Sequence, residues 1–160
     1  HPVMSLSFLS RVIADDKEQN GFIETMQGWV FKDHLKPIGA LSEARPHLDI
    51  AMMFLGAPYL YGGRTALGLD CSALVQLSLL ARGVACPRDS HQQEEAIGES
   101  ISEGDLRAGD LVFFKGHVGI MTSATDVLNA TARTMDTRIE PLDDLKKFYG
   151  DITSAKRISA

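Results

Sequence analysis

The stretch Leu69-Asp70-Cys71-Ser72-Ala73-Leu74-Val75-Gln76 places a cysteine where a loop turns into a helix. The glycines and the proline between residues 56 and 68 are typical of a loop. After Cys71, apolar residues recur at helical spacing as far as Gly83. Free N–H groups at a helix start favour an ionised thiol. The sequence therefore predicts that Cys71 is a nucleophile with a free thiol.

A thiol nucleophile needs a base and a group that orients the base. His117 begins a predicted strand, and Asn129 lies in the next predicted strand. A hairpin between them would bring Asn129 roughly opposite His117, where its amide oxygen can accept the imidazole N–H. Gly116 and Gly119 are expected to leave room for a substrate backbone. Each residue alone has a commoner structural role, so the combination carries the prediction.

Asp70 has two compatible interpretations. Aspartate is a common helix cap, and a carboxylate beside the nucleophile is also suited to hold a substrate ammonium group. Ser72 supplies a further donor and acceptor there. Cys86 is expected to be a small buried side chain, and we expect no bridge between it and Cys71.

Residues 1–38 are predicted to form β structure that is too small to bury a core of its own. Strands are expected at residues 7–13, from residue 22 and from residue 28, with a polar turn over residues 15–21. This fragment is interpreted as the end of a small β-barrel. Residues 39–45 are predicted to be a linker, and residues 46–160 to be the catalytic domain.

The rest of the chain changes from helical to strand periodicity. Helices are expected from Pro46, from Cys71 and after a capping-box pattern at Ser90. The predicted strands that follow cover residues 111–114, 118–122, 127–130 and 138–140. Helices followed by consecutive antiparallel strands predict an α+β fold with helices packed on an antiparallel sheet.

Composition excludes several classes of function. The 160 residues carry a formal net charge of −5, and the sixteen Lys and Arg are scattered, so no nucleic-acid partner is expected. No apolar run approaches the roughly 20 residues of a membrane span, and no Cys/His cluster predicts a metal or other cofactor. We expect a monomer. The start His-Pro-Val lacks a signal pattern, so we expect the chain to begin inside a longer protein.

Five segments, in order and with family-like spacing, resemble the NlpC/P60 peptidases. They are residues 56–64, 69–76, 87–93, 109–114 and 116–120. The N-terminal part, with residues 28–30 and 34–37, resembles the close of a bacterial SH3-type barrel. The resemblance implies a papain-like fold. It also implies hydrolysis of the γ-D-glutamyl–diamino acid bond in peptidoglycan stem peptides, so the expected partners are peptidoglycan fragments or muropeptides.

By this resemblance Cys71 is the nucleophile and His117 is the base. Asn129 stands where relatives often carry His, which removes a possible charge from that position. Tyr59 matches a tyrosine that lies beside the nucleophile and helps to bind the oxyanion. Ala73 stands where relatives usually carry Gly, and we expect a helix to tolerate it.

The resemblance also suggests substrate-binding residues. Asp70 and Ser72 match positions that recognise a free N-terminal L-Ala in relatives with SH3-like domains. Tyr61 and Arg64 are predicted to contact substrate as well. Arg64 and Arg88 match positions that are often basic, and surface salt bridges explain both equally well.

Two rival functions stay open at this point. One is a wall-binding module that has lost catalysis, against which the intact Cys71, His117 and Asn129 argue. The other is an acyl transferase or amidase of the same superfamily, although lipid-acting relatives tend to place His before Cys. A free-amine requirement favours peptide recycling in the cytoplasm, with periplasmic or extracellular wall turnover as the alternative.

Overall fold

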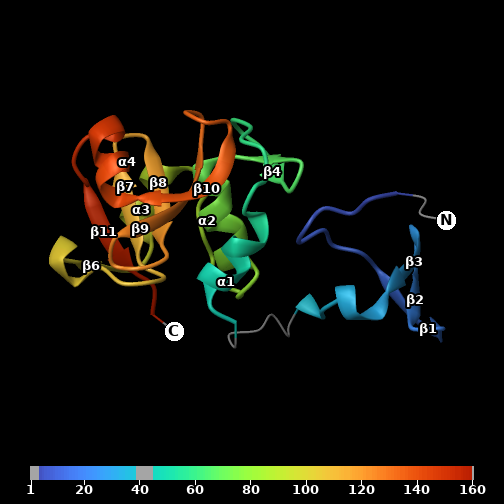
Figure 1. Ribbon diagram of the computed structural model, residues 1–160. Coiled ribbons are helices and arrows are strands. Elements are labelled where there is room, and N and C mark those ends of the chain that lie inside the picture. Colours follow the sequence, from blue (N-terminus) through green and yellow to red (C-terminus); the bar gives the residue numbers. More distant parts are fainter. Residues whose placement is uncertain (1–3, 39–44, 160) are drawn as a thin grey trace. The chain divides into compact units, whose positions relative to one another are not determined.

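A six-stranded sheet in the order β10-β9-β8-β7-β11-β6 is the framework of the C-terminal part of the chain (Figure 1). The computed structural model describes residues 4–38 and 45–159. The chain divides into two compact units, residues 1–41 and 42–160. All pairings in the large sheet are antiparallel, which confirms the predicted sheet type.

The helices and strands of the C-terminal unit alternate irregularly along the chain. They are α1 (His47–Ala51), η3 (Met52–Phe54), β4 (Arg64–Thr65), β5 (Gly68–Leu69), α2 (Cys71–Leu80), α3 (Ser90–Ala96), β6 (Glu99–Ile101), η4 (Glu103–Asp105), β7 (Leu111–Phe114), β8 (His117–Met121), β9 (Asp126–Thr131), β10 (Asp136–Pro141), α4 (Leu142–Tyr149) and β11 (Ser154–Arg157).

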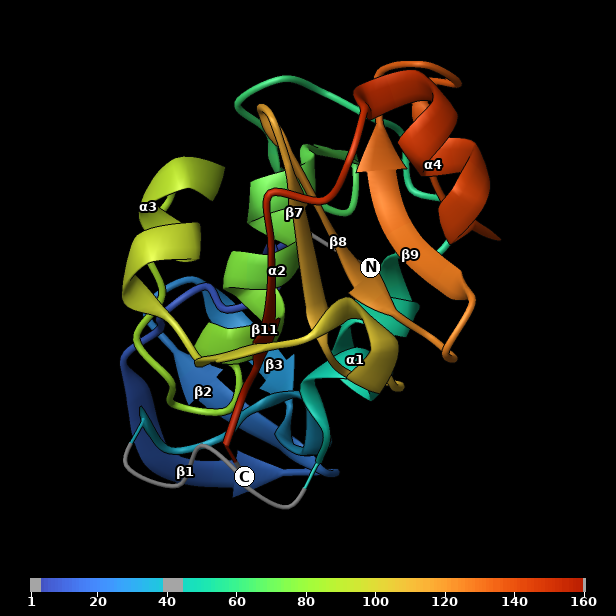
Figure 2. The same cartoon turned by 90° about the vertical axis from the view of Figure 1, so that its left-hand side faces the viewer.

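Helices pack against the sheet, and apolar side chains between the helices and the sheet form the core. α2 packs against β8 and β9, and both α1 and α3 contact α2 (Figure 2). α4 contributes Leu142 and Leu145 to a buried cluster with Phe114, Met121 and Val127 from the strands. His117 and Met121 share one face of β8 because side chains alternate along a strand. The predicted α+β class, with helices packed on an antiparallel sheet, is confirmed.

The predicted elements around the site are confirmed, with one error at a cap. The helices expected from Pro46 and Cys71 and the four expected strands are present. The helix after Ser90 is also present, but Ser90 is its first residue rather than its cap. Asp89 occupies the cap position, and no side chain caps this helix.

The N-terminal unit is a three-stranded antiparallel meander of β1 (Ala14–Gln19), β2 (Phe22–Thr25) and β3 (Gly28–Phe31), followed by the short helix η1 (Lys32–His34). The strand predicted at residues 7–13 was wrong, because the polar stretch taken for a turn is itself β1. The turn is shorter and consists of Asn20 and Gly21, both with positive φ. An Asn-Gly pair favours such a tight hairpin turn.

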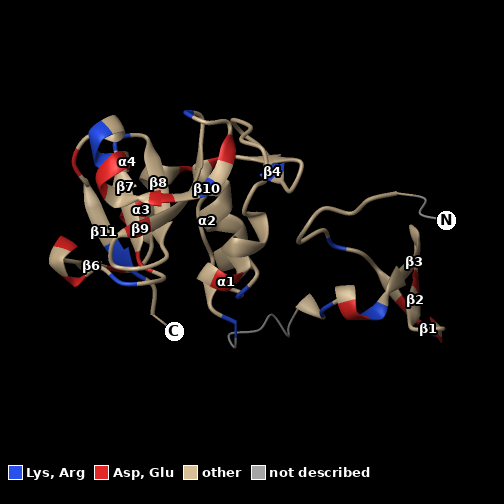
Figure 3. Cartoon of the chain, viewed as in Figure 1, with Lys and Arg blue, Asp and Glu red and all other residues tan. Residues whose placement is uncertain are grey.

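Charges are mixed over both units. In the view of Figure 3, Lys and Arg lie among Asp and Glu, without one large patch of either sign. Among the described residues, no helix combines the length and the apolar character that crossing a membrane requires.

Candidate active site

Cys71 is the first residue of α2, directly after the cap residue Asp70. The Asp70 carboxylate accepts the backbone N–H of Ala73 at 2.9 Å, so the predicted cap is present. Both cysteines are free thiols, and the Cys71 side chain is buried with 9% exposure. The backbone N–H of Val118, next to His117 on β8, lies within hydrogen-bonding reach of the thiol. The start of α2 therefore sets the thiol beside the start of β8.

His117 and Asn129 meet on neighbouring strands. The His117 Nε2 and the Asn129 Oδ1 are 3.0 Å apart in a buried contact. Pairing of Ile120 with Leu128 continues to bring Asn129 across from Gly119, two residues from His117. Asn129 thus reaches His117 diagonally rather than from directly opposite.

Gly119 makes this diagonal contact possible. A Cβ atom there would lie 2.3 Å from the Val127 side chain and 3.4 Å from the Asn129 Cβ. The space beside Gly119 is therefore filled by β9. The expectation that this glycine leaves room for a substrate backbone was wrong.

The contact with Asn129 fixes the proton arrangement of His117. An amide oxygen only accepts, so His117 Nε2 carries the proton and Nδ1 keeps a free lone pair. Burial lowers the pKa of His117 to about 4, although the hydrogen bond to Asn129 opposes this shift. The imidazole is consequently neutral at pH 7 and able to accept a proton.

Burial also controls Cys71. It raises the pKa of the thiol to about 11, against the lowering effect of backbone N–H groups that include that of Val118. The carboxylate of Asp70 raises it further. The helix start does favour the thiolate, as expected, but desolvation outweighs it. At pH 7 the thiol of Cys71 and the imidazole of His117 are therefore both neutral.

Asp70 is engaged on both oxygens by Arg88. The Arg88 Nη2 lies 2.6 Å from Oδ2, and the Arg88 Nη1 lies 2.9 Å from Oδ1. Arg88 also donates to the Ser72 hydroxyl at 2.8 Å, and the Gly62 N–H donates to Asp70. Burial would raise the pKa of Asp70, but Arg88 and the backbone donors outweigh it and lower the pKa. The salt-bridge interpretation of Arg88 is confirmed, in a partly buried setting.

The other predicted residues lie at different depths. Burial raises the pKa of Tyr59 to about 12, and the nearby Cys71 and Asp70 add to this shift. Tyr59 therefore keeps its hydroxyl proton near Cys71. Tyr61 is 87% exposed, and Arg64 is exposed on β4, so neither is held in the buried centre.

Two neighbours of the site were not expected from the sequence. Tyr149 at the end of α4 stacks on the imidazole of His117, with ring centroids 4.1 Å apart and an interplanar angle of 7°. Glu140 on β10 accepts the Asn129 Nδ2 at 3.2 Å. Side chains alternate along β10, so Glu140 lies on the same face as Arg138. This alternation alone does not mark Glu140 as functional. No local motif identifies Tyr149.

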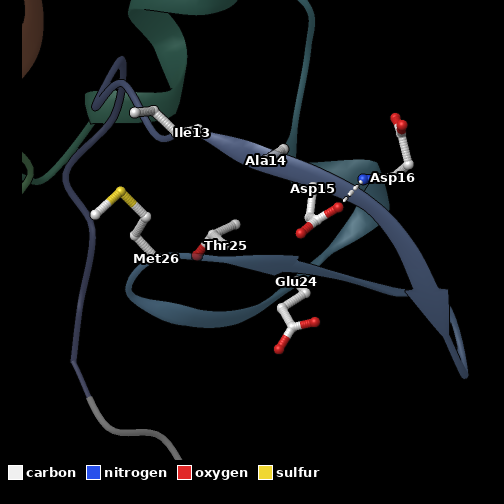
Figure 4. A pocket seen from close by; sticks show the side chains of 7 residues that line it. All are labelled: Ile13, Ala14, Asp15, Asp16, Glu24, Thr25 and Met26. Atoms are coloured by element: carbon white, nitrogen blue, oxygen red, sulfur yellow. Dashed lines mark hydrogen bonds between the residues drawn. The ribbon is translucent and has the colours of Figure 1, made fainter.

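The N-terminal unit also contains a pocket. It is lined by Ile13, Ala14, Asp15, Asp16, Glu24, Thr25 and Met26 (Figure 4). The Asp16 N–H donates to the Asp15 carboxylate at 2.7 Å. None of the predicted site residues lines this pocket. Over residues 4–38 and 45–159 there is also no group of three or more His, Cys, Asp and Glu that could hold a metal ion.

The comparisons with known proteins agree with this geometry. The model of the NlpC/P60 family matches residues 56–149, a span that contains Cys71, His117, Asn129, Tyr59 and Tyr149. The chain belongs to the NlpC/P60 family. Its α+β fold matches those of papain-like NlpC/P60 proteins of known structure.

Relatives with assigned activities are peptidases. The chain is 32% identical over 139 residues to the gamma-D-glutamyl-L-lysine dipeptidyl-peptidase of Bacillus subtilis, covering 79% of this chain and 47% of that protein. It is 35% identical over 126 residues to the bifunctional muramidase/DL-endopeptidase CwlT of the same species, covering 72% and 36%. The chain thus spans less than half of the length of both relatives.

A solved NlpC/P60 family protein from Bacillus cereus has the same fold. Its TM-score is 0.81 at 23% identity, and the match covers 95% of this chain and 55% of that one. The match extends beyond the residues of the family model into the N-terminal unit. The assignment of that unit to an SH3-type barrel stays a prediction.

Proposed function

We propose that the protein is a cysteine peptidase that hydrolyses the γ-D-glutamyl–diamino acid bond of peptidoglycan stem peptides. The observation that carries this proposal is the 3.0 Å contact between His117 and Asn129 beside the thiol of Cys71 at the start of α2. The similarity to the gamma-D-glutamyl-L-lysine dipeptidyl-peptidase of Bacillus subtilis supports the choice of bond.

Attack begins with a proton transfer within the site. His117 Nδ1 takes the thiol proton as the Cys71 sulfur bonds to the γ-glutamyl carbonyl carbon. The backbone N–H of Cys71 and the hydroxyl of Tyr59 stabilise the oxyanion, which is negative only during the reaction. His117 then gives the proton to the leaving amine, and a thioester remains.

Water completes the cycle. His117 takes a proton from the water that attacks the thioester, and the Cys71 sulfur leaves with that proton. Asn129 keeps the imidazole in the tautomer that both steps need. The two proposed steps use only Cys71, His117 and water for bond formation and proton transfer, without a metal ion or a cofactor.

The first test uses the tripeptide L-Ala-γ-D-Glu-diaminopimelate and its L-lysine counterpart. The protein should release L-Ala-γ-D-Glu, and Cys71→Ala should lower the rate by at least about a thousandfold, as expected for loss of a covalent nucleophile. Cys86→Ala is the matched control and should keep the rate, because Cys86 lies outside the site. Equal product from the wild type and Cys71→Ala would reject the proposed activity.

A preference for a free N-terminal L-Ala is the second part of the proposal. Arg88 already fills both oxygens of Asp70, so a substrate ammonium has to replace it or share the carboxylate. Ser72 lies beside this pair and would accept from the same ammonium. Arg88 and the substrate ammonium are both cations, so replacing one by the other at Asp70 leaves the net charge of the site unchanged.

The preference is measured as kcat/KM for the free tripeptide divided by that for its N-acetylated form. We expect a ratio of about 10 or more, equivalent to roughly 1.4 kcal/mol of discrimination. Arg88→Gln should raise this ratio, because it leaves Asp70 to the substrate. A ratio near one in the wild type would show that Asp70 has only its structural roles.

A further inference from the structure

Asn129 is held on both sides of its amide group. Its Oδ1 faces His117, and its Nδ2 donates to the Glu140 carboxylate at 3.2 Å and to the Arg138 carbonyl at 3.5 Å. Because Nδ2 can only donate, these two acceptors determine which end of the amide meets His117. β10 therefore sets the tautomer of the imidazole through Asn129.

Glu140 is a buried carboxylate with one cationic partner. Its residue exposure is 9%, and its other oxygen pairs with the Arg133 guanidinium. The Arg133 side chain is 33% exposed and lies over the Phe148 ring, with 5.8 Å between its Cζ atom and the ring centroid. Water can therefore reach Arg133 more easily than Glu140. A negative charge thus lies one residue behind the neutral Asn129.

We infer that Glu140 is a positioning residue, which aligns Asn129 and favours the imidazolium that forms when Cys71 gives its proton to His117. This inference rests on the proposed function for its biological meaning. Asn129 is neutral and supplies no charge next to His117. The Glu140 carboxylate supplies a negative charge one hydrogen bond further away. Glu140 takes up no proton in this step.

Cys71, Tyr149 and Asp70 also act on the reacting pair or lie near it. Cys71 on α2 is the proton donor, and Tyr149 on α4 is neutral and stacks on the ring. Asp70 acts on the thiol rather than on the imidazole, and it is paired with Arg88. The Arg133 guanidinium is paired with Glu140 and opposes the charge of that carboxylate. Removal of Glu140 and removal of Arg133 should consequently change the reactivity of Cys71 in opposite directions.

The test measures the alkylation rate of Cys71 by iodoacetamide between pH 5 and pH 9. Peptide mass spectrometry separates Cys71 from Cys86. Glu140→Gln keeps an acceptor for Asn129 but removes the charge, and it should slow the alkylation of Cys71 by about tenfold, equivalent to one pKa unit. Arg133→Gln should accelerate it. Cys86 should react equally in all variants.

Glu18→Gln is the matched control, since it removes an ion-paired carboxylate, with Lys32 as its partner, from β1 of the N-terminal unit. Its Cys71 profile should equal that of the wild type. A wild-type profile in Glu140→Gln, or slower alkylation in Arg133→Gln, would overturn the inference. If Glu140→Gln does not fold, the direction of the change in Arg133→Gln decides alone.

This experiment uses no peptidase substrate, so the two proposals fail separately. A wild type that does not cleave the tripeptide rejects the proposed function and leaves the alkylation result valid. A wild type that cleaves it, combined with an unchanged Glu140→Gln profile, rejects only the role of Glu140.

Discussion

Tyr149 lies flat against the imidazole of His117, and its hydroxyl is 2.7 Å from that of Thr131. Aromatic pairs contribute about 0.5–1.5 kcal/mol beyond area burial. The stack covers one face of the ring, while Asn129 holds its edge. In the proposed mechanism, Tyr149 thus restricts the rotation of His117 while it moves a proton from the thiol to the leaving amine.

Replacing Tyr149 separates the ring from the hydroxyl. Tyr149→Phe keeps the stack, so its kcat should stay within about fivefold of the wild type, because one neutral hydrogen bond contributes only about 1 kcal/mol. Tyr149→Leu removes the stack, and its kcat should fall by about tenfold, the upper end of an aromatic pair's energy. Steady-state kinetics on the tripeptide measures both. Equal losses in the two variants would assign the effect to the hydroxyl instead.

At the scale of the elements, the site depends on how closely β8 and β9 approach. Gly119 permits this approach, since a Cβ there would be 2.3 Å from the Val127 Cγ1. Gly119→Ala should therefore lower the free energy of unfolding by about 1–3 kcal/mol, as other overpacked cores do. It should also lower kcat, because β9 carries Asn129. Urea unfolding and tripeptide kinetics measure the two effects.

Gly104→Ala is the control for this substitution. Gly104 lies in η4, and an added Cβ there meets no atom within 4 Å. Its stability should stay within about 0.5 kcal/mol of the wild type, as for most surface substitutions. A Gly119→Ala protein as stable and active as Gly104→Ala would mean that the two strands can move apart without cost.

How far the sequence predicts each element follows from the kind of signal that it carries. The helix at Cys71 and the strand at His117 have clear periodicity and a glycine or an aspartate at their ends, so both were predicted. β1 was missed because its polar residues are exposed on both faces, and no alternation marks such a strand. The Asn20-Gly21 turn was the better signal there.

The site was predictable only where its residues lie in motifs. Cys71, His117 and Asn129 lie in or near segments with a recognisable pattern. Tyr149 and Glu140 reach the imidazole through packing of α4 and β10, which no spacing in the sequence encodes. The saturation of Asp70 by Arg88 is likewise a three-dimensional fact, because a loop and α3 must first fold onto the start of α2.

At the scale of the whole molecule, buried histidines link stability to pH. Burial lowers the pKa of His117 to about 4 and also lowers that of His47, whose Nε2 lies 2.6 Å from the Gly109 carbonyl. In the unfolded chain both histidines titrate near the ordinary histidine pKa of 6.5. Between about pH 6.5 and pH 4, the unfolded state therefore binds more protons than the folded state, and stability falls as the pH falls.

The contribution of His117 can be isolated by its removal. From the shift between 6.5 and about 4, this residue accounts for a loss on the order of 3 kcal/mol on going from pH 7 to pH 4. His117→Gln should therefore lose less stability over this range than the wild type, whatever its stability at pH 7.

The control His91→Gln, at an exposed position on α3, should lose as much as the wild type. Asp70 does not confuse the comparison, because its lowered pKa moves its effect on stability below the ordinary aspartate pKa of 3.8. Urea unfolding at pH 7, 5.5 and 4 measures these losses, and equal losses in all three proteins would show that His117 is more accessible to protons than its burial indicates.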